Sequence, residues 1–256
     1  MTNASIAVCP LYAEQLIRAQ KLAANLTLPL LASPHDDSLP YDYLLVVTPD
    51  YVGLQAVADK RFAPFYINFL SETLIYRLNQ ASLRKELIAR AMGCKPSQAP
   101  RIVDATAGLG RDSFILAALG FSVVLIERSG IIHALLADAM ERASLNPDYA
   151  PIIQRMVLIK ADAKDWLSAQ SSHPDIIYLD PMFPERKKSA SVKKEMVTFK
   201  NVLGTDPDSD ELLQLALTCA AHRVVVKRPR LAANIGEKPP NFSLTGKNSR
   251  FDIYLV

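Results

Sequence analysis

The sequence predicts an α/β protein in which a doubly wound, mostly parallel sheet follows a small α+β region. Three observations support this fold class. From Arg101 to the end of the chain, short apolar runs alternate with longer helical patterns, as strands and helices do around a parallel sheet. A turn that contains two glycines separates the first of these strands from its helix. The 256 residues, half of them hydrophobic and 21% charged, suffice for one large domain with a smaller appendage.

Residues 1–95 form the expected small N-terminal α+β region. Strands are predicted at Ile6–Cys9, Tyr43–Thr48 and Phe65–Phe69, and helices at Leu11–Leu26 and Leu83–Met92. Gly93 stands where a helix C-cap is expected. The segment Lys95–Pro100, with two prolines, is the expected connector to the second domain.

The second domain, residues 96–256, contains the regular alternation. Strands are predicted at Ile102–Ala105, Ser122–Ile126, Met156–Lys160, Asp175–Leu179, Arg223–Val226 and Phe251–Val256. Helices are predicted at Asp112–Leu119, Ile131–Ser144 and Glu211–Ala220. Ligands of such a sheet bind beyond the carboxyl ends of the strands, where the strand order reverses, so we expect the functional site at that edge.

The bulk composition excludes several classes of protein. No apolar run approaches the roughly 20 residues needed to span a bilayer, and the N-terminus lacks a secretory signal. The three cysteines, Cys9, Cys94 and Cys219, and the four histidines show no metal-ligand spacing. We therefore expect a cytoplasmic protein with reduced thiols and no metal site. The net charge of +3 is too small by itself to indicate a nucleic-acid-binding protein.

The segment DATAGLGRD, which begins at Asp104, predicts a nucleotide-type pocket after the first regular strand. Gly108 and Gly110 let the backbone bend sharply and approach a ligand. A dinucleotide-binding turn would carry a third glycine where this chain has Ser113. Asp112 stands at the helix start, where a pyrophosphate would need a free positive helix end. An acid there suits a cationic ligand, or simply caps the helix.

Two further acids follow neighbouring strands. Glu127 can accept hydrogen bonds from both hydroxyls of an adenosine ribose, unless it is a solvated acid at a strand end. Asp162 can accept from the adenine amino group, and it can equally be the N-cap of a helix over Ala163–Leu167. The expected pocket holds an adenosine whose other end is lined by acids and carries no phosphate. S-adenosylmethionine fits that description better than NAD does.

The fourth strand ends in an unusual string, Asp180-Pro181-Met182-Phe183-Pro184. An exocyclic amine on a nucleobase is a poor nucleophile, so its N–H groups need acceptors and its base must be held in place. Asp180 supplies a carboxylate, Phe183 a face on which a base can stack, and Pro181 stiffens the tip. We call these three residues the amine clamp. The alternative is an acid that caps a turn, with Phe183 in the core.

Five segments together resemble one known family. They are Asp104–Asp112 (DATAGLGRD), Leu179–Pro184 (LDPMFP), Lys193–Met196 (KKEM), Val224–Pro229 (VVVKRP) and Arg250–Tyr254 (RFDIY). The chain resembles the ribosomal RNA small subunit methyltransferase J family, a bacterial family that methylates N2 of a guanosine near the 3′ end of small-subunit ribosomal RNA. The resemblance is close from Arg101 to Val256 and loose before Leu83. Asn79–Ser82 replaces a glycine-rich stretch of the family.

The resemblance implies a Rossmann-like, class I methyltransferase sheet. It also implies S-adenosylmethionine as cofactor, S-adenosylhomocysteine as product, and no metal. The residues that it places on the cofactor are Arg111, Asp112, Glu127, Arg128, Asp162, Ala163 and Asp180, in addition to Asp104, Gly108 and Gly110 of the glycine turn. The implied partner is small-subunit (16S) ribosomal RNA or the assembled 30S subunit, with no membrane and no obligate protein partner.

Two basic clusters follow the tips of the fourth and fifth strands. The first contains Arg186, Lys187, Lys188, Lys193 and Lys194, and the second contains Lys227, Arg228 and Arg230. In a sheet of this type the two strands are neighbours, so the clusters would flank the amine clamp and could bind an RNA backbone. Lys187, Lys188, Lys227 and Arg228 are the expected phosphate contacts, and Arg250 could join them. The alternative is a solvated charged face.

The sequence therefore predicts direct methyl transfer to guanine N2, in which Asp180 orients the amine and Phe183 stacks on the base. The proton then passes to Asp180 or to water. Three alternatives stay open: an amine methyltransferase that acts on another nucleic acid, an NAD-dependent oxidoreductase, and a non-catalytic RNA-binding module. The missing third glycine argues against the oxidoreductase, and the intact Asp-Pro-Met-Phe string argues against the binding module.

Overall fold

The computed structural model describes residues 4–33, 40–59, 63–181 and 207–256. The chain divides into two compact units. One comprises Met1–Asn68, Gly130–Arg142 and Pro184–Thr205, and the other comprises Phe69–Ser129, Ala143–Phe183 and Asp206–Val256. Residues 69–95 thus group with the second unit, whereas the sequence prediction assigns them to the N-terminal region. The division at residue 95 remains a proposal.

The first unit contains a three-stranded sheet in the order β1-β2-β3. Its strands are β1 (Ile6–Pro10), β2 (Tyr43–Val47) and β3 (Val52–Ala56), with β1 parallel and β3 antiparallel to β2. Helix α1 (Leu16–Leu26) follows a short 3-10 turn and packs against β1. The prediction of a strand at Phe65–Phe69 is wrong, because only Phe65 of these residues pairs, in an isolated bridge with Leu54.

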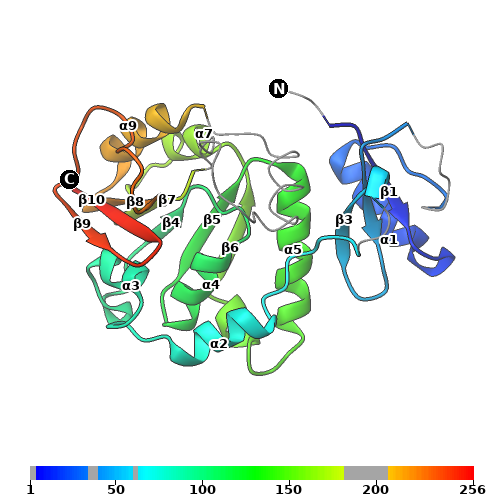
Figure 1. Cartoon of the computed structure of the whole chain (residues 1–256), viewed down its shortest axis with the longest axis horizontal. Coiled ribbons are helices and arrows are strands. Elements are labelled where there is room, and N and C mark those ends of the chain that lie inside the picture. Colours follow the sequence, from blue (N-terminus) through cyan, green and yellow to red (C-terminus); the bar gives the residue numbers. More distant parts are fainter. Residues whose placement is uncertain (1–3, 34–39, 60–62, 182–206) are drawn as a thin grey trace. The chain divides into compact units, whose positions relative to one another are not determined.

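The second unit is built on a seven-stranded sheet in the order β6-β5-β4-β7-β8-β10-β9 (Figure 1). The strands are β4 (Ile102–Asp104), β5 (Val123–Glu127), β6 (Met156–Lys160), β7 (Ile176–Leu179), β8 (Arg223–Pro229), β9 (Phe242–Thr245) and β10 (Ser249–Leu255). The first five in chain order are parallel, and β10 runs antiparallel to both β8 and β9. The predicted doubly wound, mostly parallel sheet is confirmed.

Helices cover both faces of this sheet. On one face α7 (Ala163–Ser168) packs on α9 (Ser209–Cys219), and on the other α2 (Glu72–Gln80), α3 (Leu87–Met92) and α6 (Ala150–Ile153) each contact α4 (Arg111–Ala118) (Figure 1). Helix α5 (Gly130–Ser144) follows β5. The predicted C-cap is confirmed, since Gly93 ends α3 with a φ of +66°. None of the helices in the described part of the chain is long and apolar enough to span a membrane.

The central strands are mostly apolar because both of their faces are covered. All four residues of β7 are buried, and so are Val224, Val225 and Val226 of β8. Successive side chains point to opposite faces of a strand. Val224 and Val226 therefore pack with Leu213 of α9, whereas Tyr178 of β7 points to the α4 face, where its hydroxyl reaches Asp112. The same alternation sends neighbouring residues of β8 to opposite faces of the sheet.

Candidate active site

The strand order of the large sheet reverses between β4 and β7, where β5 and β6 continue to one side and β8 to the other. The chain segments that follow β4 and β7 are joined directly. The backbone N–H of Asp180 donates a hydrogen bond to Oγ1 of Thr106 at 2.6 Å. The predicted glycine turn and the predicted amine clamp therefore meet at the switch point, which is where a ligand of such a sheet binds.

The glycine turn is held by the acid at the end of β5. Gly108 and Gly110 have φ angles of +52° and +66°, a left-handed conformation that favours glycine. The two oxygens of Glu127 accept hydrogen bonds from the backbone N–H groups of Gly108, at 2.9 Å, and Ser129, at 2.7 Å. Glu127 is only 7% exposed. Glu127 therefore stabilises the turn and is not a solvated acid. Its contact with a ribose stays a prediction.

Asp104 at the end of β4 is a buried carboxyl group with two donors. It accepts a hydrogen bond from Ser113 Oγ at 2.5 Å and one from the backbone N–H of Thr106 at 3.2 Å. Burial raises the pKa of Asp104 to about 7, although both hydrogen bonds lower it. Ser113 occupies the position where a third glycine would stand, and its hydroxyl serves to hold this carboxyl group.

Asp112, in the first turn of α4, is surrounded by donors. Its side chain accepts hydrogen bonds from Lys227 Nζ at 2.7 Å, the Tyr178 hydroxyl at 2.9 Å and Arg77 Nη1 at 3.0 Å. Burial would raise the pKa of Asp112, but the positive charges of Lys227 and Arg77 outweigh it and lower the pKa to about 2. The N-cap of α4 is Gly110, so capping is not the role of Asp112.

Asp180 follows β7 and shares the ammonium group of Lys227. Lys227 Nζ donates to Asp180 Oδ2 at 2.8 Å. Burial raises the pKa of Asp180, and the charge of Lys227 opposes that rise only in part. The side chain of Asp180 is nevertheless 40% exposed, so a ligand can reach it. Pro181 is buried beside it, and Phe183 lies outside the described residues.

At the third strand tip, the expected N-cap is confirmed. Oδ1 of Asp162 accepts from the backbone N–H of Lys164 at 2.8 Å, at the start of α7. Arg128 lies beside it, with Nη1 4.0 Å from Asp162 Oδ2 and 3.2 Å from Asp208 Oδ2. Ala163 is buried, whereas the side chain of Arg111 is exposed. Capping occupies one oxygen of Asp162 and is compatible with a ligand contact through the other.

In the described part of the chain, the predicted phosphate contacts are Lys227, Arg228 and Arg250, and these side chains have partners inside the protein. The pleat of β8 sends Lys227 to the α4 face and Arg228 to the α9 face. Arg228 is 6% exposed and donates through Nε and Nη2 to the carbonyl of Ala233. Lys227 is bonded to two carboxylates. The structure therefore does not support phosphate contacts by either residue. Arg250 is likewise internal, since it pairs with Asp252 at 2.8 Å. The cluster from Arg186 to Lys194, with Lys187 and Lys188, lies outside the described residues.

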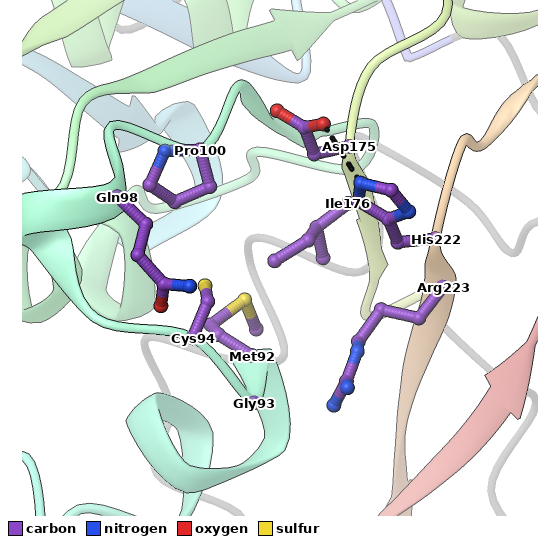
Figure 2. Close-up of a pocket in the computed structure, with 9 residues that line it drawn as sticks. All are labelled: Met92, Gly93, Cys94, Gln98, Pro100, Asp175, Ile176, His222 and Arg223. Carbon is purple, nitrogen blue, oxygen red and sulfur yellow. Dashed lines mark ion pairs between the residues drawn. The ribbon is translucent and has the colours of Figure 1, made fainter.

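A separate hollow of about 320 Å³ lies at the opposite ends of β7 and β8. Figure 2 shows its lining, in which His222 Nε2 is 3.4 Å from Asp175 Oδ1 and the guanidinium of Arg223 extends toward Gly93. The other lining residues are Met92, Cys94, Gln98, Pro100 and Ile176. None of the sequence-predicted site residues lines it. The chemistry-bearing residues gather instead at the carboxyl edge of the sheet.

Sequence reasoning missed four residues of the site. Arg77, Thr106, Ser113 and Tyr178 each hold one of the predicted acids. The sequence does carry a signal for Ser113, because a residue with a hydroxyl group stands three residues after Gly110, where a third glycine would be expected. No local signal marks Arg77, because its partner Asp112 is 35 residues away.

Comparisons with known proteins show what this chain is similar to. Residues 31–256 match the model of a family described as "Putative SAM-dependent methyltransferase". The ribosomal RNA small subunit methyltransferase J of Thioalkalivibrio sulfidiphilus is 46% identical over 241 residues, 93% of each chain. That of Nitrosococcus oceani is 46% identical over 258 residues, which cover both chains completely. The crystal structure of a SAM-dependent methyltransferase from Neisseria gonorrhoeae, 32% identical, matches with a TM-score of 0.76 over 97% of this chain and 96% of that one.

Proposed function

Because this chain belongs to the SAM-dependent methyltransferase family, together with full-length relatives named ribosomal RNA small subunit methyltransferase J, we propose that it methylates the exocyclic N2 of a guanosine in small-subunit ribosomal RNA. The observation that carries this proposal is the exposed carboxylate of Asp180. The backbone N–H of the same residue donates a hydrogen bond at 2.6 Å to Thr106 in the glycine turn. An acceptor for an amine thus stands directly beside a nucleotide-type pocket.

The residues at the carboxyl edge suit S-adenosylmethionine. When bound, this cofactor supplies a methyl group activated by a positively charged sulfonium. Carboxyl groups follow all of β4, β5, β6 and β7, and a field of that sign attracts a cation and disfavours a phosphate. We assign Glu127 to the ribose hydroxyls and Asp162 to the adenine amino group. Asp104, Gly108, Gly110, Arg111, Asp112, Arg128, Ala163 and Asp180 complete the proposed cofactor site.

The amine clamp would prepare guanine N2 for attack. The lone pair of this nitrogen is delocalised into the ring, so the amine gains from acceptors that hold its N–H groups in one orientation. The carboxylate of Asp180 is such an acceptor, and the backbone carbonyls of Asp180 and Pro181 are further candidates. Phe183 is proposed to stack on the base, a contact worth about 1–3 kcal/mol in proteins that bind single-stranded nucleic acid.

The RNA backbone is proposed to run past Lys187 and Lys188, the remaining candidates for phosphate contacts. The substrate is either the free ribosomal RNA or the assembled 30S subunit, and an enzyme with either substrate would work in the cytoplasm. Membership of a SAM-dependent family does not favour the NAD-dependent oxidoreductase. The intact Asp-Pro-Met-Phe string does not favour a non-catalytic binding module.

The test uses the purified chain, labelled S-adenosylmethionine, and small subunits from a strain that lacks the gene. Nucleoside mass spectrometry is expected to find one N2-methylguanosine per subunit. Free ribosomal RNA from the same strain is assayed in parallel, and the faster substrate identifies the form that the enzyme recognises. Transfer to neither substrate, or transfer to another nucleoside, would overturn the proposal. NAD in place of the cofactor serves as the binding control and is expected to give no heat in calorimetry.

A further inference from the structure

Lys227 occupies the centre of the candidate active site, between the acid next to the glycine turn and the acid of the amine clamp. Its Nζ is 2.7 Å from Asp112 Oδ2 and 2.8 Å from Asp180 Oδ2. Its side chain is 28% exposed. Burial would lower the pKa of Lys227, but the two carboxylates outweigh it and raise the pKa above its usual value. Lys227 therefore stays positively charged in the site.

The sheet itself brings Lys227 to this point. Strands β7 and β8 are parallel neighbours, and Leu179 is paired with Val226. The next residues along the two strands are Asp180 and Lys227, so they lie level with one another at the strand ends. The pleat turns Lys227 toward α4, whose first turn carries Asp112. The contact is thus set by backbone register, not by a chance approach of two surface side chains.

Lys227 also belongs to a chain of alternating charges. Glu86, the N-cap of α3, pairs with Arg77 at 2.8 Å, and Arg77 pairs with Asp112 at 3.0 Å. Lys227 then links Asp112 to Asp180. Each charge in this chain has a neighbour of opposite sign, and the series ends at the exposed carboxylate of Asp180. Removing Lys227 would leave two carboxylates facing one another in a largely buried site, which is costly.

The two oxygens of Asp180 are not equivalent. Oδ2 accepts from Lys227, whereas Oδ1 accepts no hydrogen bond from any residue in the described ranges. We propose that Lys227 is a positioning residue for methyl transfer, which holds Oδ2 of Asp180 so that Oδ1 receives the N–H of the substrate amine. This proposal rests on the proposed function. It also replaces the phosphate contact that the sequence suggested for Lys227.

The charge of Lys227 has a second consequence, because a proton on Oδ1 of Asp180 would make that oxygen a donor instead of an acceptor for the amine N–H. Among the residues that the structure describes, the charged and titratable groups around Asp180 are Lys227 and Arg228 of β8, Asp112 of α4, Tyr178 of β7 and Asp104 of β4. Burial and Asp112 raise the pKa of Asp180, and Lys227 is the largest influence that lowers it. When guanine N2 is methylated it releases one proton, which ionised Asp180 can accept or pass to water.

The proposal is tested by the pH dependence of kcat for methyl transfer to small subunits. In Lys227→Met the acid limb of the profile is expected to move to higher pH by about 1–3 units, the effect of losing an opposite charge within 4–6 Å. Activity should recover as the pH is raised through the new limb. Lys227→Gln keeps a hydrogen-bond donor without the charge and should show the same shift. Lys227→Arg keeps the charge and should leave the limb near its wild-type position.

Lys164→Met is the matched control. Lys164 also bridges two carboxylates, Asp208 at 2.9 Å and Glu211 at 3.0 Å, and neither carboxylate belongs to the clamp. Its replacement should not move the acid limb. An unmoved limb in folded Lys227→Gln or Lys227→Met would overturn the role of Lys227. Failure of the proposed function is a different result, because the wild-type protein itself would then transfer no methyl group to small subunits.

Discussion

The carboxylate of Glu127, at the end of β5, accepts a hydrogen bond at 2.9 Å from the backbone N–H of Gly108, in the turn after β4. The two residues are 19 positions apart and belong to different motifs. Their contact means that the acid proposed to bind the ribose also shapes the turn on which the cofactor would lie. Loss of this side chain should therefore affect cofactor binding in two ways.

Glu127→Ala is expected to weaken S-adenosylmethionine binding by roughly 1.5–3 kcal/mol, the scale of hydrogen bonds to a charged group. That corresponds to about a 10- to 150-fold higher Kd, measured by calorimetry. Glu211→Ala is the control, because Glu211 is 74% exposed and pairs with Lys164, away from the glycine turn. Unchanged affinity in a folded Glu127→Ala protein would remove Glu127 from the cofactor site.

Asp104 is expected to make stability fall as the pH rises. Its pKa is about 7 in the folded protein and near 3.8 in the unfolded chain. The folded state therefore holds the proton more tightly, so the stabilisation present below pH 4 is lost as the pH rises toward 7. A difference of this size is worth on the order of 4 kcal/mol. Asp104→Asn should remove this dependence.

The measurement is the free energy of unfolding by urea between pH 5 and 8 for both proteins. The difference between wild type and Asp104→Asn should change between pH 5 and about 7 and level off above the pKa of Asp104. Asp148→Asn, at an exposed turn, controls for the change of a carboxyl group into an amide. Parallel curves for wild type and Asp104→Asn would show that the Asp104 carboxyl group does not titrate in this range.

Lys187 and Lys188 should supply affinity for RNA without choosing the nucleoside, since phosphate contacts carry no base information. Each phosphate contact removed lowers the salt slope of binding by about one unit, so the double alanine variant should lower it by about two. Its KM for small subunits should rise, while its affinity for S-adenosylmethionine and the methylated position stay the same.

The salt slope is measured by RNA binding at several salt concentrations. Lys238 and Lys247, two exposed lysines, provide a double alanine control with the same loss of charge. An unaltered slope in the Lys187 and Lys188 variant would mean that these lysines are a solvated face. The RNA would then have to follow another surface of the protein.

Much of the fold could be predicted from sequence because the buried parallel strands are nearly continuous apolar runs. Every strand of the large sheet was predicted except β9, whose sequence Phe242–Thr245 is mostly exposed and so carries little hydrophobic pattern. Helix α2 was missed for a similar reason, since only Leu74 of its residues is buried. Strand β3 was also missed, because Gly53 and Gln55 interrupt its apolar run.

Most acids of the site could be predicted because they end or closely follow a strand, and parallel strands bring their carboxyl ends to one edge. Their partners could not. Arg77 reaches Asp112 only through the packing of α2 on α4. Lys227 and Arg228 are adjacent in sequence and were assigned one role, yet the pleat of β8 sends them to opposite faces of the sheet. Motif reasoning finds residue types, whereas register and pleat decide what each side chain contacts.

The central claim is that Asp180 orients the amine that receives the methyl group. Its most direct test is the single-turnover rate of methyl transfer to small subunits by Asp180→Ala, with Asp165→Ala of α7 as an exposed-acid control. We expect the rate of Asp180→Ala to fall by about 10²–10⁴-fold, the range for a positioned group that takes part in proton transfer. Folding should persist, and Asp165→Ala should act like wild type. A wild-type rate of transfer by Asp180→Ala would contradict the account.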